Sequence, residues 1–329
     1  MLLYTVRRLI ASALVLLASS ALVFVLVAST VDPLAQYRTR QPIPPPEFFD
    51  QKRQELGLDQ PVVVRYWDWL TGVLHGDFGN NIGGNPVGPT LFTRLGVTAR
   101  MVIAAMVLSV LLAIIVGVYT AVRKNKPADY VATIISYVLI ALPVFWFAVL
   151  LKEFVAIRFN ELVGTTVLYT ASEESPGISL YESGWPLWKD RLQHLVLPTI
   201  ALTGITYAAW SRFQRAAMLD VMSSEFMRFG RAKGVPYRKV LVKHGLRNAL
   251  IPLTTVVAIG IGAIFGGAII TETVFNWNGM GRYLTQDGLG QQDLNVVLGW
   301  LAVSAFFVVL FNLIADLLYA VLDPRIRLS

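Results

Sequence analysis

The stretch RMVIAAMVLSVLLAIIVGVYTAVRKNK, residues 100–126, decides the fold class of this chain. It has no charged side chain between Arg100 and Arg123. A bilayer core about 30 Å thick requires about 20 mostly apolar residues in a helix, because lipid cannot hydrogen-bond to exposed backbone groups. The sequence therefore predicts an all-α integral membrane protein with six transmembrane helices. The predicted spans lie at about residues 9–30, 100–122, 130–151, 194–215, 249–275 and 295–322.

The composition agrees with a membrane protein and excludes several classes of enzyme. Apolar residues make up 55% of the chain and charged residues 15%, against about 45–50% and about 25% in soluble domains. The chain has no cysteine and only three histidines, which excludes thiol nucleophiles and cysteine-ligated zinc. No H-E-x-x-H, G-x-S-x-G or G-x-x-x-x-G-K-[ST] motif is present. We therefore expect no catalytic site, metal site or cofactor in this chain.

Charge placement predicts the topology. The net charge is +7, but basic residues alternate with apolar blocks instead of forming one patch, so we expect no nucleic-acid partner. The short turn Arg123-Lys124-Asn125-Lys126 follows the second span, and short basic loops stay on the cytoplasmic side. Both termini and the segment 212–248 fall on that side. The first span exceeds the about 7–15 apolar residues of a signal peptide, so we expect a retained anchor in a multi-pass cell-membrane protein.

Residues 31–99 are expected to form a small extracytoplasmic cap. The cap opens with a proline-rich stretch at 41–46, which lacks the amide donors of a regular helix. A helix-like pattern runs from Pro46 through Trp69, and a glycine-rich, turn-forming passage follows. The expected division of the chain is 1–30 for the cytoplasmic N-terminus and first helix, 31–99 for the cap, and 100–329 for a five-helix membrane core.

A second external loop is expected at residues 160–192. It is rich in acidic and aromatic residues. Anchoring at the membrane interface accounts for the aromatic residues; contact with a partner protein on the external side, or a position at the rim of the entrance, is the alternative.

The cytoplasmic loop at residues 216–248 contains the most informative segment. From Glu225 the sequence reads EFMRFGRAKGVPYRKVLVKHGLRNALIP. Gly234 interrupts a helical pattern, and Pro236 suits the first turn of the next helix. Apolar spacing near 3.6 places Val240, Leu241, His244 and Leu250 on one face. A short helix with separate basic and apolar faces suits a groove on a partner; a basic loop that sets topology or binds anionic lipid is the alternative.

The run Arg231-Ala232-Lys233-Gly234, followed ten residues later by His244 to Leu250, carries a resemblance. This segment resembles the EAA loop of ABC-importer membrane subunits, in the variant of the dipeptide, oligopeptide and nickel permease family. It departs from the pattern where Arg228-Phe229-Gly230 replaces the Glu-Ala-Ala that names the loop. Nearly the whole chain is similar to the B-type subunit of peptide permeases. The further landmarks are Tyr4 with Arg7-Arg8, Gly57-Leu58-Asp59-Gln60-Pro61, Gly76-Asp77-Phe78-Gly79, Glu272-Thr273-Val274-Phe275, Gly279-Met280-Gly281-Arg282 and Asp323-Pro324-Arg325.

This resemblance implies the type I permease fold of ABC importers, in which a short coupling helix docks into the ATP-binding subunit. It implies a sister C-type permease subunit, two ATP-binding subunits or one fused ATPase, and an external substrate-binding protein that delivers short peptides. ATP and Mg would bind to the ATPase partners, and none to this chain. The residues assigned to the coupling loop are Glu225, Arg228, Gly230, Arg231, Ala232, Lys233, Gly234, Val235, Pro236, Tyr237, Arg238 and His244.

Three other functions remain open at the level of sequence. The first alternative stays within the family: the transported solute is nickel or another small molecule instead of a peptide. From other classes, the chain is a stand-alone channel or ion-coupled carrier, or an intramembrane enzyme. Co-purification with an ATPase separates the importer from a stand-alone channel or carrier, and the sequence shows no nucleophile-base or metal-ligand set that would favour an enzyme.

A few residues at membrane depth are candidates for the transport pathway. Glu272 and Thr271 lie near the outer end of the fifth span, where burying a charge is costly; a buried pair or an interfacial position is the alternative for Glu272. Gly262 and Gly266 have the small-x-x-x-small spacing that lets helices approach closely, so they suit a gate or plain packing. Trp146 belongs to an aromatic run after Pro143 that suits a pore lining, a core contact or a lipid contact.

Overall fold

The structure is a computed structural model that describes residues 2–38 and 41–322, and it gives no strand in that part of the chain beyond one isolated bridge. At 2–4, 36, 261–267 and 315–322 only the backbone is described. Contacts group the chain into two units. One is built on Ala99–Trp277, and the other on Val6–Thr98 and Asn278–Val309.

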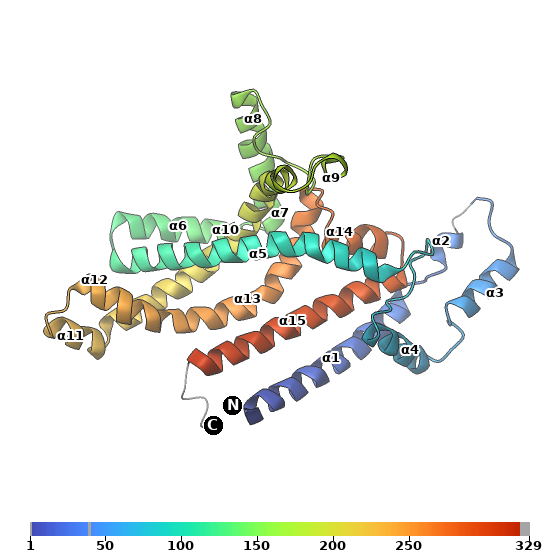
Figure 1. Ribbon diagram of the computed structural model, residues 1–329, viewed down its shortest axis with the longest axis horizontal. Helices are drawn as coiled ribbons and strands as arrows, with labels where there is room; N and C mark the ends of the chain where they lie inside the picture. The colour runs from blue at the N-terminus through green and yellow to red at the C-terminus, as the bar shows by residue number, and fades with distance from the viewer. Residues whose placement is uncertain (1, 39–40, 323–329) are drawn as a thin grey trace. The chain divides into compact units, whose positions relative to one another are not determined.

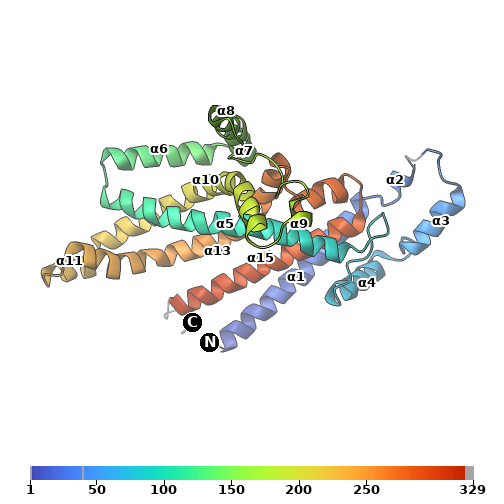
Figure 2. The ribbon, with the colours of Figure 1, turned by 45° about the horizontal axis from the view of Figure 1, so that its top comes forward.

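The first unit is a set of long helices around α10, which packs against α6 and α13. Figures 1 and 2 both show α10 and α13 side by side. The elements of this unit are α5 (Val87–Val122, from Ala99 onward), α6 (Pro127–Ala141), α7 (Val144–Leu150), the π-helix η1 (Leu151–Ile157), α8 (Arg158–Val163), α9 (Ile178–Tyr181), α10 (Trp185–Ser223), α11 (Glu225–Ala232), α12 (Tyr237–Val240), the π-helix η2 (Leu241–Leu246) and α13 (Arg247–Val274).

Two glycines allow the helices of this unit to approach closely. A Cβ at Gly117 of α5 would lie 2.8 Å from Cβ of Gln214 on α10. A Cβ at Gly260 of α13 would lie 2.8 Å from the indole ring of Trp210, also on α10. Real Cβ atoms do not come this near to other carbon atoms, so a larger residue at either position would push the helices apart.

The predicted third span is not one straight helix. α6 ends at Ala141, Leu142 is extended at φ −82° and ψ 129°, and α7 begins after Pro143. The helix pair Pro127–Ala141 and Val144–Val163 is bent by 110°. Proline has no amide proton and disfavours helical geometry in the residue before it, which explains the position of the break. Pro198, in contrast, lies inside the continuous helix α10.

Four helices of the described chain are long and apolar enough to cross a bilayer: Thr5–Thr30, Val87–Val122, Trp185–Ser223 and Leu294–Ile314. The bent pair makes a fifth if it counts as one span. The predicted span at 249–275 corresponds to α13, which contains the segment 261–267. The count of six spans stays a prediction.

The second unit joins the cap to helices from both ends of the chain. Its elements are α1 (Leu2–Thr30), α2 (Ala35–Arg38), α3 (Pro46–Glu55), α4 (Val62–Leu74), α14 (Met280–Arg282), the π-helix η3 (Tyr283–Leu289) and α15 (Leu294–Leu322). Its hydrophobic core contains Phe78, Val87, Leu91, Met280, Tyr283, Val296 and Val303. The predicted helix from Pro46 through Trp69 is two helices, because Gly57 has φ +60° and Pro61 precedes the first turn of α4.

A buried carboxylate fixes the start of α15 within this unit. Asp293 is 3% exposed, and its side chain accepts the amide protons of Ile82 at 2.6 Å and Val296 at 3.1 Å. Burial raises the pKa of Asp293, while these backbone hydrogen bonds oppose the shift. The bond to Val296 caps the helix, and the bond to Ile82 ties the glycine-rich part of the cap to it.

Helix α10 begins at Trp185, within the predicted external loop at 160–192, and the extent of that loop outside the membrane stays a prediction. Its middle is held to the first unit: the amide of Ser172 donates to the carbonyl of Phe275 at 2.8 Å. Asp190 accepts both the amide and the hydroxyl of Ser175, at 2.8 and 2.6 Å. Burial raises the pKa of Glu174, but hydrogen bonds from Ser179 and Arg191 outweigh it, so the pKa lies below its usual value.

Candidate functional site

The cytoplasmic loop forms a helical hairpin between α10 and α13. Helix α11 packs against α12 and η2, and η2 packs against α10. Figure 1 shows α11 and α12 at one end of the α10–α13 pair. The sequence prediction of helix, break and helix matches this order, with the break at residues 233–236.

The hairpin has one buried side that fixes it to the long helices. Met227, Val240 and Leu241 from the hairpin share a hydrophobic cluster with Met218 of α10, together with Ala121 and Ala249. Gly230 of α11 faces Val240, since a Cβ there would lie 2.9 Å from Val240 Cγ1. The two short helices therefore hold each other through packing, because helices of this length are not stable alone.

The turn between the two helices depends on Gly234. Its φ is +76°, in the left-handed region, and a Cβ at this position would have no atom within 4 Å. The constraint is therefore the backbone conformation and not the available space. The amide of Gly234 donates to Arg231 O at 2.9 Å, and Pro236 begins the next helix by accepting the amide of Lys239 at 2.9 Å.

The opposite side of the hairpin exposes aromatic and basic residues together. Phe229 is 62% exposed and Phe226 is 42% exposed, while the Lys233 ammonium lies 4.5 Å from the Phe229 ring centroid. We call this side the hairpin surface. Its exposed members are Glu225, Phe226, Arg228, Phe229, Arg231, Ala232, Lys233, Gly234, Pro236, Tyr237, Arg238 and Lys239.

Most of the residues that the sequence assigned to the coupling loop lie on this surface. Gly230 and Val235 are half-buried and act in packing. The expectation that His244 shares a buried face with Val240 and Leu241 is wrong: those two are buried, but His244 is exposed and Gly245 is buried instead. The cause is the π-helical turn η2, whose wider winding shifts the faces away from 3.6-residue spacing.

Two contributors to this region were missed from the sequence. The first is the pair Phe226 and Phe229, whose i,i+3 spacing on the face opposite Met227 was a readable signal. The second is the ion pair between Asp129 of α6 and Arg215 of α10, with two N···O distances of 2.8 Å. Asp129 is 3% exposed and also accepts the amide of Asn125 at 3.0 Å. No sequence signal places these two residues together.

The pathway candidates lie on α13 and α7 of the first unit. Thr271 and Glu272 are fully buried near the end of α13. Trp146 is 52% exposed on α7, beside Phe145 at 6.3 Å between ring centroids. Gly262 and Gly266 fall within 261–267, so their surroundings lie outside the described residues. A pathway role for these residues stays a prediction.

A comparison with family models decides the kinship of the chain. Residues 110–328 match the model for the inner membrane component of binding-protein-dependent transport systems, and residues 1–91 match the model for the N-terminal part of such components. The chain belongs to this family. The permease is thus a multi-pass membrane subunit of an ABC importer, a class that acts together with ATPase, permease and binding-protein partners and carries no catalytic site of its own.

Relatives align over most of the permease. It is 38% identical over 326 residues to the oligopeptide transport system permease protein OppB of Mycobacterium tuberculosis, covering 99% of each chain. It is 34% identical over 294 residues to the dipeptide transport system permease protein DppB of Escherichia coli, covering 86% of each chain. The predicted kinship with B-type permeases is confirmed by these alignments.

A solved structure supports the fold. The permease resembles a chain of the MetNI methionine ABC transporter in an inward-facing conformation, with a TM-score of 0.56 and 17% identity, over 71% of the permease and 96% of that chain. At this identity the likeness concerns the fold alone. It confirms the predicted all-helical architecture of ABC-importer permeases.

Proposed function

We propose that this permease is one of two channel-forming subunits of an ATP-driven importer of short peptides. The observation that carries the substrate class is the alignment, over 86–99% of the chain, with proteins named as oligopeptide and dipeptide permeases. The described residues hold no cluster of three or more histidine, cysteine or acidic side chains that suits a metal ion, so no observation favours nickel over peptides. A stand-alone channel is disfavoured because the family is defined by its dependence on a binding protein.

The hairpin surface would be the docking site for an ATP-binding subunit. Aromatic side chains and arginine are the residues that most often dominate binding at protein interfaces. Phe229 and Phe226 expose apolar area next to Arg231 and Lys233. Neither phenylalanine belongs to the hydrophobic cluster that holds the hairpin to the long helices. The hairpin is fixed to α10 and α13 on its other side, so a movement of the docked subunit would be passed directly to these long helices.

The remaining parts of the machine follow from this assignment. Both termini and the hairpin would face the cytoplasm, and the cap would face the external binding protein. A sister C-type permease subunit would complete the channel. Either two ATP-binding subunits or one fused ATPase would bind ATP and Mg, and this chain would bind no cofactor. ATP at one end and the loaded binding protein at the other would bias a two-state pathway.

The decisive experiment reverses charge on the hairpin surface. Arg231→Glu and Lys233→Glu, in membranes that contain all partner subunits, are expected to weaken co-purification of the ATP-binding subunits about tenfold, or about 1.4 kcal/mol. Uptake of a labelled tripeptide should fall with it. Both residues are exposed, so the amount of folded permease should not change.

Lys126→Glu is the matched control, because Lys126 is also exposed and basic but lies in the turn between α5 and α6. It should leave co-purification and uptake unchanged. Full tripeptide uptake by both hairpin variants would falsify the docking role. Absence of tripeptide uptake by the wild-type transporter would instead refute the substrate class.

A further inference from the structure

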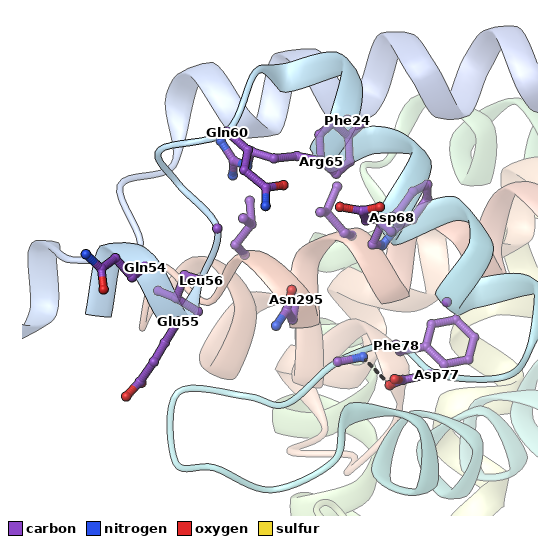
Figure 3. Close-up of a pocket in the computed structure, with 16 residues that line it drawn as sticks. Phe24, Gln54, Glu55, Leu56, Gln60, Arg65, Asp68, Asp77, Phe78 and Asn295 are labelled. Atoms are coloured by element: carbon purple, nitrogen blue, oxygen red, sulfur yellow. Dashed lines mark hydrogen bonds between the residues drawn. The ribbon is translucent and has the colours of Figure 1, made fainter. Parts of the chain in front are cut away.

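The second unit contains a pocket that the transport cycle described above does not use. It encloses about 380 Å³ and is bordered by α1, the connection between α3 and α4, helix α4 and the start of α15. A neighbouring cavity of about 480 Å³ shares Glu55, Leu56, Gly79, Leu294 and Asn295 with it. Figure 3 shows Gln60, Arg65 and Asp68 along one side and Asn295 across from them, whereas Glu55 points away. Volumes of about 300–1,000 Å³ are typical of small-molecule sites.

Arg65 is an unpaired cation in this pocket. It is half-buried on α4, and no carboxylate of the described residues lies within ion-pair distance of its guanidinium. Burial lowers the pKa of Arg65, and no acidic neighbour counteracts the shift. A partly desolvated guanidinium without a carboxylate is costly, and its planar group of donors matches a carboxylate in two-point contact.

A second donor beside the pocket also lacks an acceptor. The indole N–H of Trp69, one turn along α4 from Arg65, is buried and has no hydrogen-bond partner in the described chain. Natural proteins leave few such groups unsatisfied, and each needs an explanation. Both residues line the same cavity, but the indole N–H of Trp69 is covered, so the half-buried Arg65 guanidinium is the donor that points to an acceptor from outside this chain.

The other side of the pocket offers acceptors. Asn295 donates from Nδ2 to Asn80 O at 2.7 Å, which leaves its Oδ1 as an acceptor. Asp77 accepts the amide of Gly79 at 2.8 Å through Oδ1, which leaves its second oxygen available. The close approach of Asn295 requires Gly79, where a Cβ would lie 2.8 Å from Asn295 Nδ2. The pocket thus combines an unpaired guanidinium with free acceptors, as a zwitterion requires.

We propose that this pocket binds a short peptide through its terminal carboxylate, which Arg65 holds, while Asp77 lies on the side of the amino group. The occupant is a small zwitterion because Arg65, Asn295 and Asp77 line one pocket of about 380 Å³. The site would receive substrate in the cap before it enters the membrane part. This inference rests on the proposed function, which supplies the peptide class and the external position of the cap.

The test measures peptide binding by the full-length permease purified with its copurifying subunits. Trialanine and trialanine amide are titrated against wild-type protein, Arg65→Gln and Arg65→Lys by calorimetry. We expect the amide to bind wild type at least about tenfold more weakly, and Arg65→Gln to weaken trialanine by a similar factor. Arg65→Gln should not distinguish the two peptides, because the contact that separates them is gone. Arg65→Lys should recover part of the affinity.

Arg53→Gln is the control, because Arg53 is exposed on α3 and does not line the pocket. It should bind trialanine like wild type. The inference is overturned if wild type does not bind trialanine, if it binds the amide equally well, or if Arg65→Gln keeps wild-type affinity. It is also overturned if Arg65→Gln weakens only capture of the binding protein, since an acidic residue of that protein would then be the occupant. Tripeptide uptake by wild-type cells, measured alongside, shows whether the proposed function itself stands.

Discussion

Substitutions at Gly234 test whether the hairpin turn is held by backbone conformation. Its φ of +76° costs an ordinary residue about 1–2 kcal/mol, and the open space around the position means that no steric clash adds to this cost. Gly234→Ala is therefore expected to favour opening of the turn by about 5- to 30-fold, since about 1.4 kcal/mol corresponds to a factor of ten. Gly234→Asn should cost less, because asparagine adopts left-handed geometry more readily.

Hydrogen exchange of the amides in residues 225–246 measures this directly. Protection in Gly234→Ala should fall by that factor, and co-purification of the ATP-binding subunits should fall with it. Gly164 provides the matched control: it has φ +73°, a Cβ added there would also meet no atom within 4 Å, and it follows α8, outside the hairpin. Gly164→Ala should leave co-purification unchanged. Equal effects of alanine and asparagine at Gly234 would refute the reasoning.

Three further predictions concern the first unit. Asp129→Ala should destabilise the purified permease by about 2 kcal/mol. This is less than the about 3–5 kcal/mol lost on breaking a fully buried pair, because Arg215 is 29% exposed. Thermal unfolding should show that adding Arg215→Ala costs little more, and simple additivity of the two effects would contradict the pairing. Because the pKa of Glu174 is lowered in the folded protein, its carboxylate stabilises the loop above about pH 4.5, and this stabilisation is lost as the pH falls below that value. Amides around Glu174 should then exchange faster at low pH, and Glu174→Gln should abolish this dependence. Gly204→Ala should cost about 1–3 kcal/mol, because the new methyl group meets the Phe147 ring; Phe147→Leu should restore stability, and no rescue would place the strain elsewhere.

The sequence was most informative where a single physical requirement dominates. The charge-free run of 101–122 needs a helix in lipid, and α5 contains all of it. The sequence does not predict which prolines interrupt a helix. Pro143 ends a helix and accompanies a 110° bend, whereas Pro198 lies buried inside the unbroken α10. The two have the same chemistry, so the difference comes from packing with distant segments, which spacing along the chain does not encode.

The candidate site shows the same division. Gly234 and Pro236 predicted the turn correctly because both act through local backbone geometry. The exposure of His244 was missed because a π-helical turn changes the face that each residue occupies. The pocket around Arg65 was not predicted at all, since its residues are brought together from segments more than 200 positions apart.

Two buried methionines, Met218 of α10 and Met227 of α11, take part in the hydrophobic cluster that joins the hairpin to α10. A Cβ added at Gly245 would lie 3.4 Å from Met218 Cε and 3.5 Å from Met227 Sδ. Methionine is unbranched and flexible, so it refills a gap of changed shape at little cost. If the hairpin surface docks an ATP-binding subunit as proposed, we expect these methionine contacts to let the hairpin tilt against α10 without opening a void. We expect a branched side chain at either position to restrict that movement, because it has fewer rotatable bonds than methionine.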